Sequence, residues 1–184
     1  MVSIMTSYSM LAAINLTKKN TESIVAAFAL LKREFNIKER LVIVGKHPRE
    51  RLLKLAMRLG LRPSDVVFTG YVPEEHLPCF YSSAKVFVFP SFHESFGMPI
   101  LEAMACGCPV VTSIFYACRE VAGDAAVLVN PFNVRDIAFA VHRLLVNEKL
   151  RRRLKVKGLK RARKFTWSRS ALTHLAVYRA VVRG

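Results

Sequence analysis

Short apolar runs alternate with longer amphipathic stretches along most of the chain. Runs of four or five residues rich in Val, Ile and Phe predict buried strands, because a strand covered on both faces is apolar throughout. The predicted strands span residues 8–14, 41–44, 66–69, 86–89, 110–112 and 126–129. Apolar residues spaced three and four apart predict helices at 21–35, 49–59, 74–82, 99–105, near 119, at 134–146 and at 168–182, with basic helical sequence up to 165. This alternation predicts an α/β fold with a parallel sheet of about six strands flanked by helices.

Turn-forming residues follow the predicted strands and helices. Gly45 and Gly70 end strands, Gly60 ends a helix, and Asn20 is suited to cap the helix that follows it. Strands that run in the same direction have all their carboxyl ends at one edge of the sheet. The loops expected at that edge are 14–20, 45–46, 70–72, 90–97 and 112–113. Open α/β sheets bind their ligands in a crevice at this edge.

Two carboxylates mark the segment that runs from His93 to Ala103. Glu94 follows a predicted strand, and Glu102 lies early in the next predicted helix, which is otherwise apolar. A glutamate in an apolar helix costs stability unless something pairs with it, and hydroxyl groups of a bound sugar or ribose would be suitable partners. Two structural alternatives stay open, in which Glu94 caps amides near Gly97 and Glu102 forms a buried ion pair with an arginine. His93 is interpreted as an ordinary polar loop residue, since the spacing excludes an HExxH zinc site.

The composition fits one domain over residues 1–184, with an ill-defined start at 1–14 and basic helices at 148–184. Hydrophobic residues make up 52% of the chain, and the formal net charge is +16. Nine of the cations lie between Arg151 and Lys164. They predict either the solvated face of a helix or a surface for an anionic membrane. In the first case the inward residues would be Leu150, Leu154, Val156 and Leu159. Nucleic acid is not expected as a partner, because no aromatic residues are interleaved with the cations.

The four cysteines form no CxxC pair and have no histidine at zinc spacing. They are Cys79, Cys106, Cys108 and Cys118. We expect them to be small buried residues of a protein in the reducing cytosol, without a metal site. The start of the chain has no basic leader followed by a long apolar centre, so we do not expect a signal peptide. The predicted location is cytoplasmic, with the cytosolic face of a membrane as a peripheral site.

Several short motifs occur in an order that is familiar from one protein family. They are the Lys18-Lys19-Asn20 triplet and the segments 41–45, 67–72, 77–81, 90–97, 109–113, 120–124, 130–131 and 165–167. On these motifs the chain resembles the carboxyl-terminal, donor-binding domain of retaining glycosyltransferases of the GT-B fold, in glycosyltransferase family 4 (glycosyl transferases group 1). The resemblance covers residues 18–178. The resemblance implies a Rossmann-like domain that forms one half of a GT-B fold, with extra C-terminal helices.

The resemblance also implies roles for individual residues. Glu94 and Glu102 are the two acids of the EX7E motif, and they would contact the donor sugar and the ribose of the nucleotide. The main chain around Phe96, Gly97 and Met98 would face the sugar and the diphosphate. Lys19 would supply positive charge to the diphosphate, and the backbone near Val72 would reach the base. No catalytic residue, metal or other cofactor is implied within this chain.

The function implied is that of the nucleotide-sugar-binding half of a hexosyltransferase, such as a mannosyl- or glucosyltransferase that uses a UDP-sugar or GDP-sugar. The amino-terminal acceptor domain is absent from the sequence, so we expect little or no activity from the chain alone. One departure is that the Gly-Arg pair often found before the lysine is replaced within Ala12–Asn15. The alternatives are a non-catalytic partner subunit that binds nucleotide-sugar or membrane, and a nucleotide-sugar epimerase-like domain.

Overall fold

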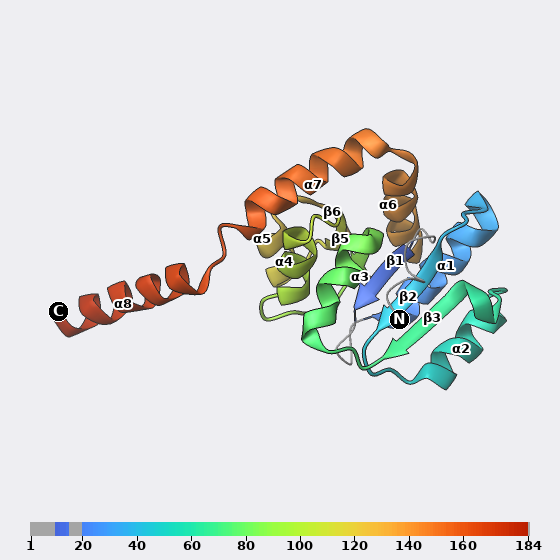
Figure 1. The fold of residues 1–184 in the computed structure, drawn as a ribbon, viewed down its shortest axis with the longest axis horizontal. Coiled ribbons are helices and arrows are strands. Elements are labelled where there is room, and N and C mark those ends of the chain that lie inside the picture. The colour runs from blue at the N-terminus through green and yellow to red at the C-terminus, as the bar shows by residue number, and fades with distance from the viewer. Residues whose placement is uncertain (1–9, 15–19, 184) are drawn as a thin grey trace.

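The computed structural model describes residues 10–14 and 20–183, with side chains described for residues 20–182 (Figure 1). It contains a six-stranded sheet in the order β3-β2-β1-β4-β5-β6, and every neighbouring pair is parallel. The strands are β1 (Met10–Ile14), β2 (Arg40–Val44), β3 (Val66–Gly70), β4 (Ala84–Phe89), β5 (Val110–Ser113) and β6 (Ala126–Val129). The α/β class, the parallel sheet and its size are therefore as the sequence predicted.

Helices connect successive strands and cover both faces of the sheet. They are α1 (Thr21–Phe35), α2 (Arg49–Arg58), α3 (Leu77–Ser83), α4 (Met98–Ala105), α5 (Tyr116–Ala122), α6 (Val134–Val146), α7 (Glu148–Ala162) and α8 (Trp167–Arg183). Two short 3-10 turns, η1 (Pro63–Asp65) and η2 (Glu74–His76), precede β3 and α3. The predicted helix at 74–82 is thus a 3-10 turn followed by a short α-helix, since Pro78 near the start of α3 interrupts the hydrogen bonding of a continuous helix.

Two apolar cores lie on opposite faces of the sheet. Val86 and Val88 of β4 point into one core with α1 and α6, whereas Phe87 and Phe89 point into the other with α4 and α5. This alternation follows from the two-residue repeat of a strand. Because all four of these side chains are buried, the stretch 86–89 of β4 has no polar face. Its carboxyl end is therefore fixed from both sides, and the loop that follows it starts from a rigid position.

The basic helix α7 packs against α4 through residues spaced four apart. Leu150, Leu154 and Gly158 are buried, and a Cβ added at Gly158 would lie 3.1 Å from Cγ of Met104 on α4. This row leaves Val156 on the opposite side of the helix, 53% exposed. The expectation that Val156 turns inward is therefore wrong, because its position two residues after Leu154 rotates it by about 200° around the helix.

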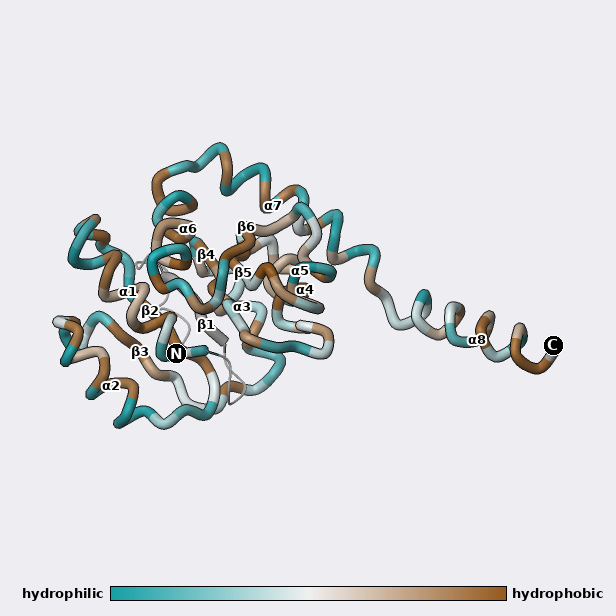
Figure 2. Tube along the Cα trace, turned by 180° about the vertical axis from the view of Figure 1, so that it is seen from behind, coloured by the Kyte–Doolittle hydropathy of each residue, from teal (hydrophilic) through white to brown (hydrophobic). Residues whose placement is uncertain are grey.

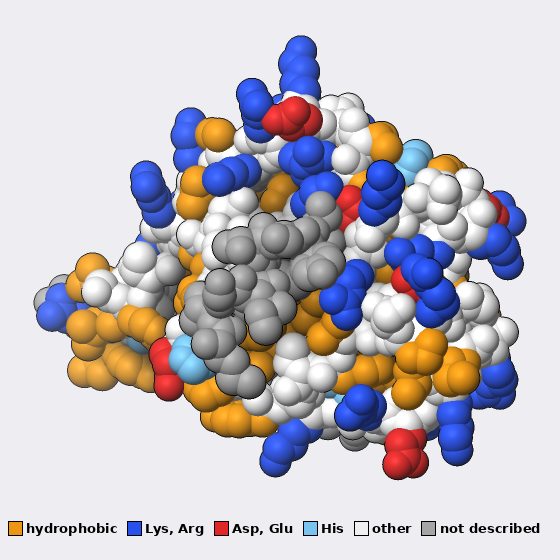
Figure 3. Space-filling view, turned by 45° about the vertical axis from the view of Figure 1, so that its right-hand side comes forward, with side chains coloured by type: hydrophobic (Ala, Val, Ile, Leu, Met, Phe, Trp, Pro, Cys, Tyr) orange, Lys and Arg blue, Asp and Glu red, His pale blue; other side chains and the backbone are white. Residues whose placement is uncertain are grey.

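Part of the positive charge of α7 has a structural partner. Arg151 donates to the carbonyl oxygens of Leu144 and Leu145 at the end of α6, and Arg161 donates to those of Glu120 and Val121 on α5. Lys157 pairs with Asp124 at 2.6 Å. The cations on the outer face are exposed, and they include Arg153, Lys160, Arg163 and Lys164. Figure 3 shows Lys and Arg side chains spread over one face of the molecule with few Asp or Glu among them.

Helix α8 extends away from the rest of the molecule (Figure 1). Its apolar residues recur at three- and four-residue spacing and form a stripe that is exposed to solvent, which comprises Trp167, Ala171, Leu175, Tyr178, Val181 and Val182. Figure 2 shows hydrophilic residues along much of α7 and a mixture of both kinds along α8. The stripe buries nothing within the described part of the chain.

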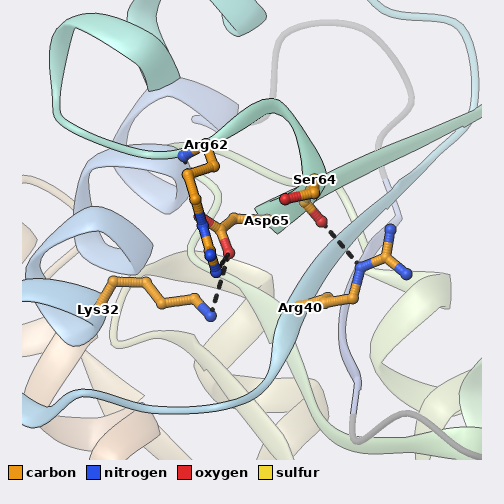
Figure 4. A network of polar contacts seen from close by, with 5 residues as sticks. All are labelled: Lys32, Arg40, Arg62, Ser64 and Asp65. Atoms are coloured by element: carbon orange, nitrogen blue, oxygen red, sulfur yellow. Dashed lines mark hydrogen bonds and ion pairs between the residues drawn. The ribbon is translucent and has the colours of Figure 1, made fainter.

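A network of ion pairs and hydrogen bonds lies at the amino ends of β2 and β3 (Figure 4). Asp65, just before β3, accepts hydrogen bonds from the backbone and guanidinium of Arg62 and pairs with Lys32 of α1 at 3.3 Å. The hydrogen bonds from Arg62 lower the pKa of the Asp65 carboxyl to about 2, against the opposing effect of its burial. Arg40 at the start of β2 donates to the carbonyl oxygen of Ser64 at 2.9 Å. The network ties α1, η1 and β2 together.

Candidate functional site

The candidate site lies where the order of the strands reverses. Strands β1 and β4 are neighbours in the sheet, and the connections that leave them lead to α1 and to α4. These two helices belong to opposite cores, and open α/β sheets bind their ligands at such a switch point. Lys19, predicted to face the diphosphate, lies outside the described residues. The other predicted site residues lie on the β4–α4 connection, on α4 itself and just after β3.

The β4–α4 connection is held by its own polar groups. Ser91 is buried, and its hydroxyl donates to the carbonyl oxygen of His93 at 3.1 Å. His93 is exposed, and Glu94 is half-buried. Glu94 therefore sits in a short loop that follows the carboxyl end of the buried strand β4.

Helix α4 begins at a glycine whose backbone is left-handed. Gly97 has a φ of 96°, and a Cβ at this position would lie 3.1 Å from Cδ1 of Ile100. Only glycine adopts this conformation without strain, and here it turns the chain into the helix. On either side, Phe96 and Met98 are 42% and 45% exposed. The amides of this turn lie at the positive end of the helix dipole, which suits an anion such as a diphosphate.

Glu102 is positioned by a buried tyrosine on α3. The hydroxyl of Tyr81 donates to Oε2 of Glu102 at 2.7 Å, and the Tyr81 side chain is only 1% exposed. Burial, together with the nearby carboxylate, raises the pKa of Tyr81, so its hydroxyl stays protonated and remains a donor. The predicted alternative, an ion pair between Glu102 and an arginine, is wrong, since the partner is a neutral hydroxyl. The direction of the half-buried carboxylate is thus fixed by a neutral donor.

The end of β3 lies at the same carboxyl edge of the sheet. Gly45 donates to the carbonyl oxygen of Gly70 at 2.9 Å, which joins the ends of β2 and β3. Val72 follows this contact, is half-buried, and packs against the core that contains α4. The backbone near Val72 is therefore fixed on the opposite side of β1 from Glu94 and Glu102.

Asn20 links three connections of the carboxyl edge. It stands at the start of α1 with a φ of 61°, but its side chain makes no capping bond. Instead its amide nitrogen donates to the carbonyl oxygens of Pro90 and Pro131, at 2.9 and 2.7 Å. The predicted capping bond is therefore not formed, because the amide nitrogen of an Asn side chain at a helix start can instead donate to buried carbonyls of neighbouring loops. Neither this role nor that of Tyr81 was predicted, although both residues lie within the quoted motifs.

The side chains that commonly bind metals are dispersed in the part of the chain that the structure describes. Among the described residues, no group of three or more His, Cys, Asp or Glu side chains is placed to hold a metal ion. Cys108 and Cys118 are buried as expected, and burial raises the pKa of Cys108 to about 12. Cys79 is exposed and Cys106 half-buried, so the expectation of burial is wrong for Cys79, which lies on the outer side of the short helix α3. No helix in the described part of the chain is long and apolar enough to cross a membrane.

Comparison with known proteins adds to this geometry. The family model described as glycosyl transferases group 1 matches residues 9–161. The serotype-specific mannosyltransferase WbdA of Escherichia coli is 37% identical over 163 residues, which cover 87% of this chain and 20% of that protein. The O-antigen chain mannosyltransferase B of Escherichia coli is 35% identical over 163 residues, 88% of this chain and 43% of that protein. The chain thus spans less than half the length of these curated relatives.

Solved structures agree on the fold. Sucrose-phosphate synthase from Thermosynechococcus elongatus has a TM-score of 0.82 and 29% identity, and the match covers 97% of this chain and 46% of that one. HepE from Anabaena, solved in complex with UDP and glucose, has a TM-score of 0.82, with 97% of this chain and 50% of that one covered. Its identity of 17% supports a likeness of fold alone.

Proposed function

Since the chain belongs to the glycosyl transferases group 1 family, we propose that it is the donor-binding half of a retaining hexosyltransferase that uses a nucleotide diphosphate-sugar. The observation that carries the proposal is the placement of Glu102. Its carboxylate is held by the buried hydroxyl of Tyr81 and lies on the helix that begins at the switch between β1 and β4. Such a switch point is where α/β sheets of this kind bind nucleotides.

In this proposal the donor lies along the carboxyl edge of the sheet. Glu102 accepts hydrogen bonds from the ribose, and Glu94 from hydroxyls of the sugar. The amides around Phe96, Gly97 and Met98 face the diphosphate, with Lys19 as the cation, and the backbone at Val72 contacts the base. Retaining transfer builds negative charge on the departing diphosphate, and the helix start and Lys19 would stabilise that charge. The names of the two mannosyltransferase relatives support mannose as the transferred sugar.

A separate acceptor domain would complete the enzyme. The proposal is supported by the length of the relatives, of which the chain spans between 20% and 43%. It is also supported by the apolar stripe of α8, which is exposed along its whole length within the described chain. A stripe of this size is typical of a surface that another part of a protein covers. Little sugar transfer is therefore expected from the 184 residues alone.

The test is a titration with UDP, GDP and their mannose and glucose conjugates, followed by thermal shift and calorimetry. A ligand that binds only the folded chain raises its melting temperature. Glu102→Gln should weaken the binding of UDP or GDP by about tenfold, since it removes the charged acceptor of the ribose hydroxyls. Glu94→Gln should leave the affinity for the nucleotide unchanged and weaken only the binding of the nucleotide-sugar. Glu148→Gln, at an exposed acid of α7, is the matched control.

Two outcomes would count against the donor site. The first is that no nucleotide binds with a millimolar or better Kd. The second is that Glu94→Gln and Glu102→Gln weaken nucleotide and nucleotide-sugar equally, because the proposal assigns the two carboxylates to different parts of the donor.

The proposed location is cytoplasmic, at the cytosolic face of a membrane. It is supported by the exposed cations on the outer face of α7, where each Lys or Arg near an anionic surface contributes about 1 kcal/mol. Sedimentation with phosphatidylserine vesicles should exceed that with neutral vesicles and fall with salt. The double variant Arg153→Glu/Lys160→Glu should abolish the difference. The control Lys54→Glu/Arg58→Glu changes the charge equally on α2, and equal losses in both variants would contradict a specific role for α7.

A further inference from the structure

Four aromatic residues gather at the carboxyl edge, on the connections that follow β4, β5 and β6. They are Phe92, Phe115, Tyr116 and Phe132, and we call them the aromatic platform. The rings of Phe92 and Phe132 are stacked with centroids 4.7 Å apart, and Phe115 lies 6.2 Å from Phe132 and 6.1 Å from Tyr116. Phe92 is 38% exposed, Tyr116 67% and Phe132 70%. The rings therefore contact one another and still offer area to solvent.

The backbone beneath the aromatic platform is fixed by polar side chains. The hydroxyl of Ser113 accepts a hydrogen bond from the amide of Phe115, and Oδ1 of Asn130 accepts one from the amide of Phe132. The amide of Asn20 joins the β4–α4 connection to the β6–α6 connection through Pro90 and Pro131. The rings are thus presented by ordered loops, and a ligand would meet them already arranged.

Tyr116 has a backbone conformation that is unfavourable for tyrosine. Its φ is 49°, in the left-handed region that a bulky side chain rarely adopts. Strained residues of this kind are kept where the surrounding structure imposes them, and they are common at binding sites. The ring lies at the surface, 5.1 Å from the ring of His93.

The order of the strands relates the aromatic platform to the donor. The base end is proposed at Val72, after β3, and the sugar end at Glu94, after β4. Strands β5 and β6 continue the sheet beyond β4, on the side away from β3. A molecule that lies next to the sugar end of the donor, along the same edge, therefore meets the connections after β5 and β6.

We propose that the aromatic platform binds a pyranose ring of the acceptor, beside the sugar of the donor; this rests on the proposed function. One face of a pyranose carries C–H groups, which pack against the electron-rich face of an aromatic ring. Its rim carries hydroxyls, and the imidazole of His93 borders the aromatic platform at Tyr116. Ligand sites commonly combine aromatic walls with a few polar groups in this way. The acceptor class that this combination of rings and polar groups fits is a glycan.

The test uses the whole 184-residue chain and mannotriose as the probe, with glycerol as a comparison that has hydroxyls but no ring. Saturation-transfer NMR should label the C–H protons of mannotriose, and backbone amides of residues 115, 116 and 132 should shift on titration. Phe132→Ala should weaken the binding of mannotriose by about five- to tenfold, which is the effect expected from the loss of one aromatic contact. Phe139→Ala removes another exposed phenylalanine, from α6, and should have no effect.

A second variant separates binding from folding. Tyr116→Gly removes the ring and relieves the left-handed strain, so the melting temperature should not fall, while mannotriose binds several-fold more weakly. Neither variant should change the affinity for UDP or GDP.

The outcomes distinguish this inference from the proposed function. If nucleotides bind but mannotriose does not, or binds Phe132→Ala as well as the wild type, the aromatic platform is not an acceptor site and the donor site stands. If mannotriose binds through the aromatic platform and nucleotides do not bind at all, the donor site is wrong and the platform is a glycan site of another kind. Loss of docking to an acceptor domain in Phe132→Ala, with mannotriose unaffected, would assign the aromatic platform to a protein interface instead.

Discussion

The two edges of the sheet use polar residues in opposite ways. At the amino edge, charged groups neutralise one another: Asp65 pairs with Arg62 and Lys32, and Glu39 with Lys85 at 2.8 Å. At the carboxyl edge, Glu102 has a neutral hydroxyl as its partner, and several aromatic rings are exposed. Charges that neutralise one another contribute to folding, whereas a charge that is oriented but not neutralised can still attract a ligand. The contrast separates a stabilising edge from a binding edge within one sheet.

The glutamates of the two edges illustrate this difference. Burial is the largest single effect on Glu39 and opposes its ionisation, but the hydrogen bond and charge of Lys85, a backbone hydrogen bond and the charge of Lys32 together outweigh it and lower the pKa of that carboxyl. For Tyr81, burial and the charge of Glu102 act together to raise the pKa of the phenol. In the first case the protein stabilises the carboxylate with a cation, and in the second it stabilises the donor that orients the carboxylate. Substitutions at the two edges should therefore differ in what they change.

The largest effect on folding is expected for Asp65→Ala at the amino edge. It leaves Lys32 and Arg62 without their carboxylate and should lower the free energy of unfolding by about 3 kcal/mol. Urea denaturation followed by circular dichroism measures this loss. The affinity for UDP or GDP should be unchanged at temperatures where the variant is folded. Asp124→Ala, at an ion pair on the surface, is the control and should leave the denaturation midpoint almost unchanged. A large loss of nucleotide affinity in Asp65→Ala would contradict the separation of the two edges.

Acid should destabilise the amino edge over a defined range of pH. The pKa of Asp65 falls from 3.8 to about 2 on folding, so its contribution is complete above the unfolded pKa and is lost as pH falls through the folded pKa. The contribution is about 2 kcal/mol. Asp65→Asn cannot ionise, and its difference from the wild type should shrink as the pH falls from about 5 to about 2. A difference that stays constant over this range would show that the charge of Asp65 does not stabilise the fold.

The helices and strands were predictable from sequence because burial on both faces of the sheet gives the strands a recognisable apolar pattern. Runs such as Val86–Phe89 are apolar throughout, and the helices that cover them repeat at three and four residues. The position of Glu94 at the carboxyl edge also followed, since parallel strands share one carboxyl edge. The inward face of α7 was predicted less well. Gly158 lets α4 approach closely, so the contact row runs through a residue that hydrophobicity does not identify.

The contacts between distant segments could not be predicted. Tyr81 and Glu102 are separated by 21 positions, and Asn20 and Pro131 by 111. A tyrosine on a short apolar helix resembles any core residue, and an asparagine before a helix resembles any cap. Only the packing of α3 on α4, and the meeting of three connections at one edge, decide which hydrogen bond each side chain makes. The same is true of the aromatic platform, whose four rings come from three connections.

Tyr81→Phe tests whether the carboxyl edge is built to orient rather than to stabilise. Loss of the hydroxyl should lower the free energy of unfolding by about 1.5 kcal/mol, less than at the amino edge, because Glu102 is half-buried and water can replace the donor. The affinity for UDP should fall about fivefold, since the carboxylate is no longer held toward the ribose. Tyr178→Phe, at an exposed tyrosine of α8, is the matched control.

A comparison of UDP with its 2′,3′-dideoxy analogue gives the sharper measurement. The wild type should prefer UDP, because only UDP offers ribose hydroxyls to Glu102. In Tyr81→Phe this preference should shrink, whereas a general loosening of the fold would weaken both ligands equally and leave their ratio unchanged. An unchanged ratio would mean that Tyr81 acts only as a core residue. The hydroxyl of Tyr81 would then stabilise the fold, as the ion pairs of the amino edge do, and would not orient Glu102 for a ligand.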